Sequence, residues 1–566
     1  MPAARAAAAR LSMTPAEGFM DASLFANLLI GLIAMILVVA ATMAVSLAVR
    51  RRSPYGGYFS DSDRAAAIFA GVGGLFSVLL ALVVFLSVES YNNTRSHGDA
   101  EADAVLEQFQ IAKLFPSRVQ WNIQSKLVCY ARSVSDLEWP LMESDRSSPT
   151  VVSWESSIDD EIDSVSLVSP RAEAGFRLFL EQTLTRHKER RGRLEGAAGA
   201  LPVMVWPVLL TGAASLIALM ISYSDRAERV ASQAFQIGLV TAMLASTLLL
   251  INALDHPFSA VPGKVTPDKM RSSIALMEAE LADSIAAPRL DAVLPCGADG
   301  TALDSAPPIR AFPSGSTMAQ IVERGRLTVG VSYAIPLFGE IDPLSGNVFG
   351  VDNDLVKEIA RELGLRPEQI EFVELPPPER LPALQERRVD MVVEAITITP
   401  ERRQLVDFSR PYFVAGQSLL VNRSNRSIAG LRDLAGKKVC VIATSTGIPV
   451  LQAQAPKANL VEAPSPAACL EQLLARAVDA MTTDDVLLAG LASQNDGLLL
   501  VGGKFTVEPY GVGLPKGSAD MVAFVDDVID RMIDDGRWGR IYYEYLADIP
   551  GLTAVGDARQ RVGTMN

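Results

Sequence analysis

The sequence is poor in the residues from which metal centres and catalytic triads are usually built. Its 566 residues include only three histidines and four cysteines, and no two cysteines form a C-x-x-C pair. Zinc sites, thioredoxin-type redox sites and Ser-His-Asp triads all depend on these residues. The patterns G-x-x-x-x-G-K-[ST] and G-x-S-x-G are also absent. We therefore expect no metal, no cofactor and no enzymatic activity.

Positive charge is also scarce. The chain has 51 lysines and arginines against 65 acidic residues, which gives a formal net charge of -14. Such an acidic chain offers no electrostatic reason to expect a nucleic acid partner. Hydrophobic residues, in contrast, make up 49% of the chain, which is high for a wholly soluble protein.

Four hydrophobic runs are long enough to cross a bilayer, which takes about 20 residues. The first run is too long for the core of a signal peptide, and it ends in Arg50, Arg51 and Arg52 instead of a small-residue cleavage site. We therefore expect it to be retained as a membrane span. The four expected spans are residues 24–49, 65–88, 201–223 and 235–254.

The segment between the second and third spans, residues 89–200, has its apolar residues at helical spacing. It is expected to form a helical insert within a membrane domain. A short helix and a linker rich in Ala, Pro, Gly and Ser follow that domain. The expected boundaries are a tail at 1–23, the membrane domain at 24–260, the helix and linker at 261–320, and a tail at 551–566.

Basic residues leave the membrane orientation open. Arginines at 50–52, 64, 226 and 229 crowd the two short loops between spans. The preference of basic loops for the cytoplasm then places residues 89–200 and everything after 255 outside. The run "RHKERRGR" at 186–193 lies just before the third span and favours the opposite arrangement.

From residue 321 onward, short apolar strands alternate with amphipathic helices. "RLTVGVSY" and "KKVCVIAT" have the composition of strands, and "GVDNDLVKEIARELG" has that of a helix. This alternation predicts α/β units around parallel sheets. The expected fold class is thus an α-helical membrane domain of four transmembrane helices plus an insert, followed by a two-lobed α/β domain at 321–550. We assign 321–422 and 506–550 to lobe one, and 423–505 to lobe two.

The arrangement of spans resembles a family of bacterial membrane proteins called bestrophin-like. That family has two spans, a helical insert, two more spans and an L-D-x-P-F stop. Leu254, Asp255, Pro257 and Phe258 match the stop.

This resemblance implies a relation to pentameric anion channels whose second span lines an apolar neck. An apolar constriction gates a pore by dewetting, so a pore needs no charge in this span. On that analogy the candidate pore residues are Phe76, Leu80 and Val84. The alternative is that these side chains only pack against other helices or lipid.

The C-terminal domain resembles the type 2 periplasmic solute-binding proteins for polar amino acids, and among them the glutamate- and aspartate-type members. The resemblance rests on "VFGVDNDLVKEIARELG", "VDMVVEAITITPERRQLVDFSRPYF", "LRDLAGKKVCVIATSTG" and "EPYGVGLPKG". It implies a two-lobed domain that closes on a free amino acid, and such domains work outside the cytoplasm. This favours the orientation with the C-terminal domain outside.

A zwitterionic ligand needs a cation for its α-carboxylate and an anion for its ammonium group, and a guanidinium binds a carboxylate with two parallel bonds. The resemblance assigns the carboxylate to Arg402 and the ammonium group to Asp484. Thr397 and the backbone of Ala395 complete this part of the site in lobe one. Backbone N–H groups at a helix start attract anions, so the turn "TSTG" places Thr446 and Gly447 on the same carboxylate from lobe two.

Arg380 lies where acidic-amino-acid binders hold the ligand's distal carboxylate, so the resemblance favours glutamate or aspartate. Ser332 stands where binders of neutral or basic amino acids often have an aspartate, and Ile335 and Pro377 stand where many have aromatic residues. Glu394 adds an anion beside the site. Strand alternation turns it away from the ligand if Ala395 faces the ligand; a Glu394 that points inward makes a cationic ligand plausible. Glutamine and a basic amino acid stay open as alternative ligands.

Cys440 and Cys469 both fall in lobe two, and we expect them to form a disulfide there, which fits an outside location. Two buried free thiols are the alternative. For Cys129 and Cys296 the sequence leaves the pairing open.

The leading hypothesis is an amino-acid-gated channel of the plasma membrane, anion-conducting and a homo-oligomer, a pentamer by analogy. Ligand binding to the extracytoplasmic domain would open or close it. A second hypothesis is a membrane-anchored binding subunit of a transporter, and a third is a ligand sensor. Four spans are more than an anchor needs, and no cytoplasmic kinase or phosphatase region is visible, so both rank lower.

Overall fold

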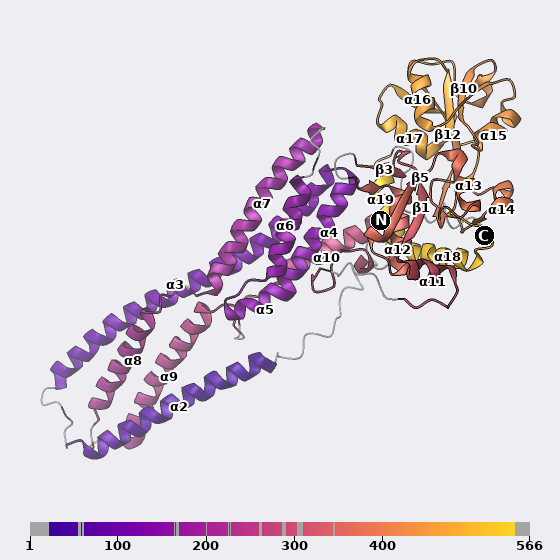
Figure 1. Cartoon of the computed structure of the whole chain (residues 1–566). Coiled ribbons are helices and arrows are strands. Elements are labelled where there is room, and N and C mark those ends of the chain that lie inside the picture. Colours follow the sequence, from indigo (N-terminus) through magenta and orange to yellow (C-terminus); the bar gives the residue numbers. More distant parts are fainter. Residues whose placement is uncertain are drawn as a thin grey trace, which may run out of the picture. The chain divides into compact units, whose positions relative to one another are not determined.

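The protein is described by a computed structural model of the whole chain (Figure 1). The tail expected at 551–566, and the tail expected at 1–23 except its last two residues, lie outside the described residues. The described residues are 22–54, 58, 62–163, 165, 169–199, 201–224, 226, 228–259, 263–285, 290–302, 310–342 and 346–549.

The chain forms two compact units, which we call the membrane unit and the binding unit. The membrane unit comprises Met1–Ile111, Tyr130–Ser157 and Arg177–Ala275. The binding unit comprises Ala112–Cys129, Ile158–Phe176 and Leu276–Asn566.

Four long apolar helices of the membrane unit carry the predicted spans, and each is long and apolar enough to cross a membrane (Figure 1). The second span does not end where the insert begins, because α3 continues for 50 residues. No proline interrupts this stretch, so nothing removes a helical N–H or blocks the preceding carbonyl. The four helices are α2 (Ala22–Arg52), α3 (Ser62–Ile111), α8 (Val205–Ser222) and α9 (Val230–Asp255).

The insert between α3 and α8 is helical, as its periodicity predicts. Its main helices are α4 (Ser117–Ser133), α5 (Trp139–Leu141), α6 (Pro149–Asp163) and α7 (Pro170–Ala197), and α10 (Asp268–Ser284) follows the last span. A π-helical turn, η2 (Val134–Glu138), joins α4 to α5. Short 3₁₀ turns are η1 (Ala112–Leu114), η3 (Met142–Ser144), η4 (Leu290–Ala292), η5 (Pro367–Gln369), η6 (Pro377–Glu379) and η7 (Leu431–Leu434).

A buried ionic network links α3, α6 and α7 with the turn η2 inside the membrane unit. Arg193 of α7 is fully buried, and its guanidinium lies 2.6 Å from Glu101 of α3 and 2.8 Å from Glu138 of η2. Arg190, one turn earlier, lies 2.5 Å from both Glu138 and Glu155. The network therefore joins two arginines to three glutamates. It pairs Arg190 and Arg193, two of the five arginines and lysines of the "RHKERRGR" run, with carboxylates inside the protein.

Two five-stranded sheets form the two lobes of the binding unit, as the alternation of strands and helices predicts. The first has the order β5-β1-β6-β15-β7, and β1 pairs in parallel with both β5 and β6, so that Val329 lies opposite Phe372 and Met391. Its strands are β5 (Ile370–Glu374), β1 (Leu327–Val331), β6 (Met391–Val392), β15 (Gly513–Leu514) and β7 (Asp407–Phe408). A small sheet beside it contains β2 (Ala334–Ile335), β3 (Gly339–Ile341) and β4 (Val348–Phe349).

The second sheet begins earlier in the chain than we expected. Strand β9 (Gln417–Asn422) lies between β12 and β13, so lobe two starts at 417 and the expected start at 423 is wrong. Only Gly416 separates β8 from β9, and the strand pairing shows that the chain changes lobes there. The other strands are β11 (Asn459–Ala463), β10 (Lys438–Ile442), β12 (Ala480–Asp484) and β13 (Leu498–Val501).

The two lobes are joined by a pair of antiparallel strands, β8 (Phe413–Ala415) and β14 (Glu508–Tyr510). Gly416 follows β8 at the crossing. A Cβ atom there would lie 2.5 Å from the carbonyl oxygen of Thr506, so the two crossing segments come this close only because residue 416 is glycine.

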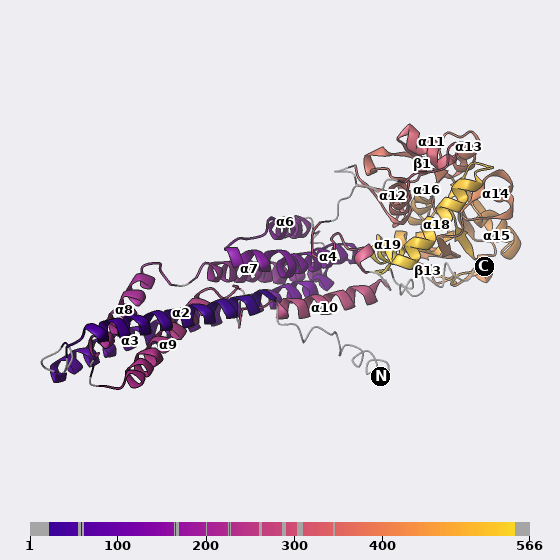
Figure 2. The same ribbon diagram turned by 90° about the horizontal axis from the view of Figure 1, so that it is seen from below.

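Helices cover both sheets. In lobe one, α12 packs against β1 and α18 against β7, and Figure 2 shows α18 in yellow across the near face of this lobe. In lobe two, α15 and α16 pack against β10. The helices of the binding unit not yet given are α11 (Thr317–Arg324), α12 (Val351–Leu363), α13 (Arg380–Gln385), α14 (Pro400–Leu405), α15 (Gly447–Gln454), α16 (Pro466–Leu474), α17 (Asp485–Ser493), α18 (Ala519–Asp535) and α19 (Arg537–Leu546).

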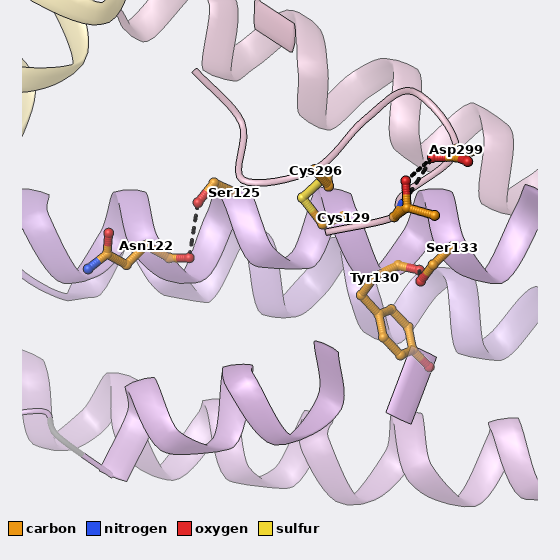
Figure 3. The surroundings of a disulfide bond; sticks show 8 residues. Asn122, Ser125, Cys129, Tyr130, Ser133, Cys296 and Asp299 are labelled. Carbon is orange, nitrogen blue, oxygen red and sulfur yellow. Dashed lines mark hydrogen bonds between the residues drawn. A yellow bond between two sulfur atoms is a disulfide. The ribbon is translucent and has the colours of Figure 1, made fainter. Parts of the chain in front are cut away.

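All four cysteines are in disulfides. Cys440 of β10 bonds Cys469 of α16 within lobe two, which is the pairing we expected. Cys129 of α4 bonds Cys296, in the segment that leads to lobe one. Figure 3 shows Cys296 on a loop that runs alongside α4.

Candidate functional site

A cavity of about 60 Å³ lies between the two lobes and brings together seven of the eight predicted ligand-binding residues. Lobe one contributes helix starts and strand ends, and lobe two contributes the turn after β10 and the end of β12. The predicted residues that line it are Arg380, Ala395, Thr397, Arg402, Thr446, Gly447 and Asp484.

Arg402 is a cation without a carboxylate partner. It lies in the short helix α14, whose N-cap Thr399 accepts a hydrogen bond from the Arg402 N–H. Its guanidinium donates to the carbonyl oxygens of Thr397 at 2.8 Å and Thr444 at 3.3 Å, and no acidic group among the described residues lies within ion-pair distance. Burial, together with the nearby charge of Arg380, lowers the pKa of Arg402 to about 10. The cavity therefore presents an unneutralised cation that an anionic ligand group would stabilise.

Asp484, at the end of β12, supplies the opposite charge. It is buried, it accepts a hydrogen bond of 2.5 Å from the Tyr510 hydroxyl, and no basic side chain among the described residues is within ion-pair distance. Burial raises its pKa to about 7, and the charges of Glu508 and Asp485 act in the same direction. A cationic ligand group beside it would lower that pKa again.

Ala395 has an unusual backbone conformation for a residue with a side chain. Its φ is 43°, in the left-handed region, where a residue with a Cβ atom is held at a cost of about 1 kcal/mol or more. The carboxylate of Asp352 accepts the Ala395 N–H at 2.7 Å and the hydroxyl of Tyr412 at 2.6 Å. Asp352 is buried, and burial raises its pKa to about 7. Asp352 thus holds the backbone of Ala395 in place from behind the cavity.

The lobe-two side of the cavity is the N-terminus of α15. Thr446 is its N-cap residue and Gly447 its first residue. The Thr446 hydroxyl donates to Glu508 at 3.1 Å and accepts from the amide nitrogen of Gln417 at 2.8 Å. The side-chain oxygen Oε1 of Gln417 is buried and has no hydrogen-bond partner among the described residues. It is therefore an acceptor ready for a donor group in the cavity.

A second cavity of about 230 Å³ adjoins the first and contains Ser332, the eighth predicted residue. The two cavities share Ile335, Pro377, Arg380 and Pro466. Glu394 also lines the second cavity and is 99% buried, but it does not line the first cavity, so a Glu394 that faces the ligand stays a prediction.

Several cavity residues were missed from sequence. The signal for Gln417 was a polar residue at the start of an apolar strand. Glu508 accepts hydrogen bonds from Gln417 and Thr446 without lining the cavity, and no role was assigned to it from the sequence. Further lining residues not predicted as ligand contacts are Ile442, Thr444, Ser445, Thr483 and Leu487.

The candidate pore residues lie in packing contacts within the chain. Phe76 is 7% exposed and sits on Gly212 of α8, where a Cβ atom would lie 2.3 Å from its ring. Leu80 and Val84 pack against the same cluster. This arrangement matches the packing alternative, so a pore lined by these three residues stays a prediction.

Two family models match the chain in the places where the sequence suggested them. The model for bacterial extracellular solute-binding proteins, family 3, matches residues 327–548, and the bestrophin-like domain model matches residues 24–262.

Similar proteins match the binding unit. The glutamine-binding protein GlnH of an ABC transporter from Bacillus subtilis is 35% identical over 235 residues, 41% of this chain and 86% of that protein. The glutamate-binding protein GluB of Corynebacterium efficiens is 31% identical over 245 residues, 41% of this chain and 83% of that protein. A solved ancestral arginine-binding protein bound to glutamine is 35% identical and covers 40% of this chain and 99% of its own, with a TM-score of 0.38.

These matches follow the division seen in the fold, with four apolar helices first and a two-lobed α/β domain after them. Through residues 327–548 the chain belongs to family 3 of the bacterial extracellular solute-binding proteins, and it carries a bestrophin-like domain at residues 24–262.

Proposed function

We propose that this membrane protein binds a free α-amino acid between its two lobes and that binding controls ion conduction through an oligomer of its bestrophin-like domain. One observation supports the ligand class above all others. Arg402 and Asp484 line the same buried cavity, carry opposite charges and have no ion-pair partner of their own among the described residues. A zwitterion satisfies both, since its carboxylate meets the guanidinium and its ammonium group meets the aspartate. The similar proteins GlnH and GluB bind glutamine and glutamate, which agrees with this assignment.

The binding unit contains an anchor for lobe one. The backbone N–H of Ser117 in α4 donates to Asp548 at 2.8 Å, beyond the end of α19. The guanidinium of Arg118 lies over the rings of Phe349 at 5.0 Å and Tyr545 at 5.9 Å, both in or beside lobe one. Lobe one is therefore held by the insert helix, and we infer that lobe two is the part that moves on ligand binding. Ligand binding shifts the equilibrium between a conducting and a non-conducting state only by the difference in ligand affinity between these two states.

Two structural features support an extracytoplasmic location of the binding unit. Disulfides such as Cys129–Cys296 and Cys440–Cys469 persist in oxidising compartments. In addition, Arg190 and Arg193 of the "RHKERRGR" run are bound to buried glutamates. They are not free cations at the membrane border, so the main argument for the opposite orientation loses weight.

The channel and a plain membrane anchor are distinguished by recording currents from the purified full chain in planar bilayers. We expect currents whose open probability changes on adding L-glutamine or L-glutamate to one side only, the side that carries the binding unit. Reversal potentials in salt gradients measure the ratio of anion to cation permeability. Anion selectivity is the part of the proposal that rests only on likeness to the bestrophin family. Silence under all conditions, together with intact amino-acid binding, would support a transporter subunit or a sensor instead.

Binding should depend on pH through Asp484. Because its pKa in the free protein is about 7, the carboxylate is protonated below that pH and must lose a proton to meet an ammonium group. Affinity should therefore be constant near pH 8 and fall by up to about tenfold per unit below pH 7. Calorimetric titrations of L-glutamine from pH 5.5 to 8.5 measure this slope. Asp352 has a similar pKa, so the Asp352→Asn variant is the control: it should keep the slope, and a slope that disappears with this substitution would refute the role given to Asp484.

A further inference from the structure

The second cavity contains an ion pair whose hydrogen-bonding capacity is not used up. A guanidinium nitrogen of Arg380 lies 2.7 Å from Glu394, but the angles are not those of a hydrogen bond. Both carboxylate oxygens of Glu394 and the Nε of Arg380 are buried without a hydrogen-bond partner among the described residues. Buried polar groups are normally paired, and leaving one unpaired is costly. This cavity thus presents a donor and an acceptor side by side, both available to a ligand.

The two groups suit a ligand that carries an acceptor and a donor on the same carbon atom. A carboxamide has this arrangement, since its oxygen accepts from Arg380 and its NH₂ donates to Glu394. We propose that the Arg380–Glu394 pair recognises the carboxamide of the ligand's side chain. The amino acid bound is then glutamine or asparagine, which is one methylene shorter. The inference rests on the proposed function, because it presumes that Arg402 and Asp484 hold the ligand's α-carboxylate and ammonium group.

Charge decides against the other side chains. Arg380 alone would attract the second carboxylate of glutamate or aspartate, but Glu394 already neutralises it and repels another anion at short range. A lysine or arginine side chain would meet the Arg380 guanidinium in the same way. An apolar side chain of equal size would leave Glu394 and Arg380 unpaired, and a site built to hydrogen-bond its ligand rejects such an analogue strongly.

The cavity also suits the length and the apolar stem of such a side chain. Arg380 lines both cavities, so the path from the α-carbon site to the second cavity passes this residue. Ile335, Leu375 and Pro377 border the second cavity and provide apolar contact for methylene groups. Glu374 lies at the same cavity but is exposed to solvent, where its charge is screened more than that of Glu394.

The test is calorimetry on the detergent-solubilised full chain at pH 8 with L-glutamine, L-glutamate, L-arginine and L-methionine. We expect glutamine to bind about tenfold or more tightly than each of the others, because only it pairs both groups. Glutamate binding as tightly as glutamine would overturn the inference while leaving the proposed amino-acid site intact. If none of the four binds and L-asparagine does not bind either, both the inference and the proposed function fail.

Two reciprocal variants test the residues themselves. Glu394→Gln removes the counter-charge of Arg380 and should move the preference toward glutamate by about tenfold or more, whereas Arg380→Gln should move it toward arginine. Both variants should still bind some amino acid through Arg402 and Asp484, and this retained binding reports that the site is folded. The proposed recognition of the carboxamide would be contradicted if the variants lose affinity for all four amino acids equally. It would also be contradicted if they keep the wild-type order of affinities.

Discussion

Replacing Arg402 by alanine is expected to weaken amino-acid binding strongly. The guanidinium is the cation that meets the ligand's α-carboxylate in the proposed site, and no carboxylate of the described part of the chain pairs with it. Removing one partner of a buried, hydrogen-bonded charge pair costs about 2–5 kcal/mol. This corresponds to a rise in Kd from about thirtyfold to several thousandfold. Calorimetric titration of L-glutamine into the purified full chain measures it.

A matched control stands next to Arg402 in the chain. Arg403 lies in the same short helix, but it is exposed and does not line the cavity, so Arg403→Ala should bind as the wild type does. Arg402→Lys keeps the charge but loses the planar fork that binds a carboxylate with two bonds; we expect intermediate affinity. Equal affinities of wild type and Arg402→Ala would refute the assignment of the carboxylate.

The second large effect is expected in the membrane unit. Arg193→Leu removes the cation that lies between Glu101 and Glu138, two side chains that are fully buried. Breaking a buried ion pair by removing one partner costs about 3–5 kcal/mol, because the remaining charge has no compensation. At about 2–4 °C per kcal/mol for a domain of this size, melting should fall by roughly ten degrees. Size-exclusion melting curves of the detergent-solubilised protein measure the shift.

Arg191→Leu is the control for this experiment, since the side chain of Arg191 is exposed on the same helix. It should leave the melting temperature almost unchanged. A double variant, Arg193→Leu with Glu101→Leu, should recover part of the loss because it removes the carboxylate that loses its arginine, whereas Glu138 keeps Arg190. If Arg191→Leu and Arg193→Leu lower the melting temperature equally, the buried network does not stabilise the unit.

Local patterns were enough to predict much of the fold. Membrane spans follow from the length and apolarity of four runs, which the bilayer requires whatever the partners are. The strand and helix alternation after residue 321 likewise predicted two α/β lobes. The motif "TITPERR" and the turn "TSTG" also led to Arg402 and Thr446, and both line the cavity between the lobes.

Long-range pairing was harder to predict. The run from Phe413 to Asn422 has the composition of strands on both sides of Gly416, yet β8 pairs with β14 and β9 pairs with β12. Composition gives a strand its tendency to form, but hydrogen-bonded neighbours from distant segments decide which sheet it joins. For the same reason Gln417, at the start of β9, was missed as a cavity residue.

By itself, the sequence determined four membrane helices and a two-lobed α/β domain, because hydrophobic length and periodicity are local properties. Its resemblance to solute-binding proteins predicted the two charges proposed for a zwitterion. The tertiary structure decided what those charges face. Glu394 neutralises Arg380 from another element, and Glu101 meets Arg193 from 92 residues away. The electrostatic effect of a side chain depends on burial and on neighbours within a few ångströms. Only the folded chain brings those neighbours together.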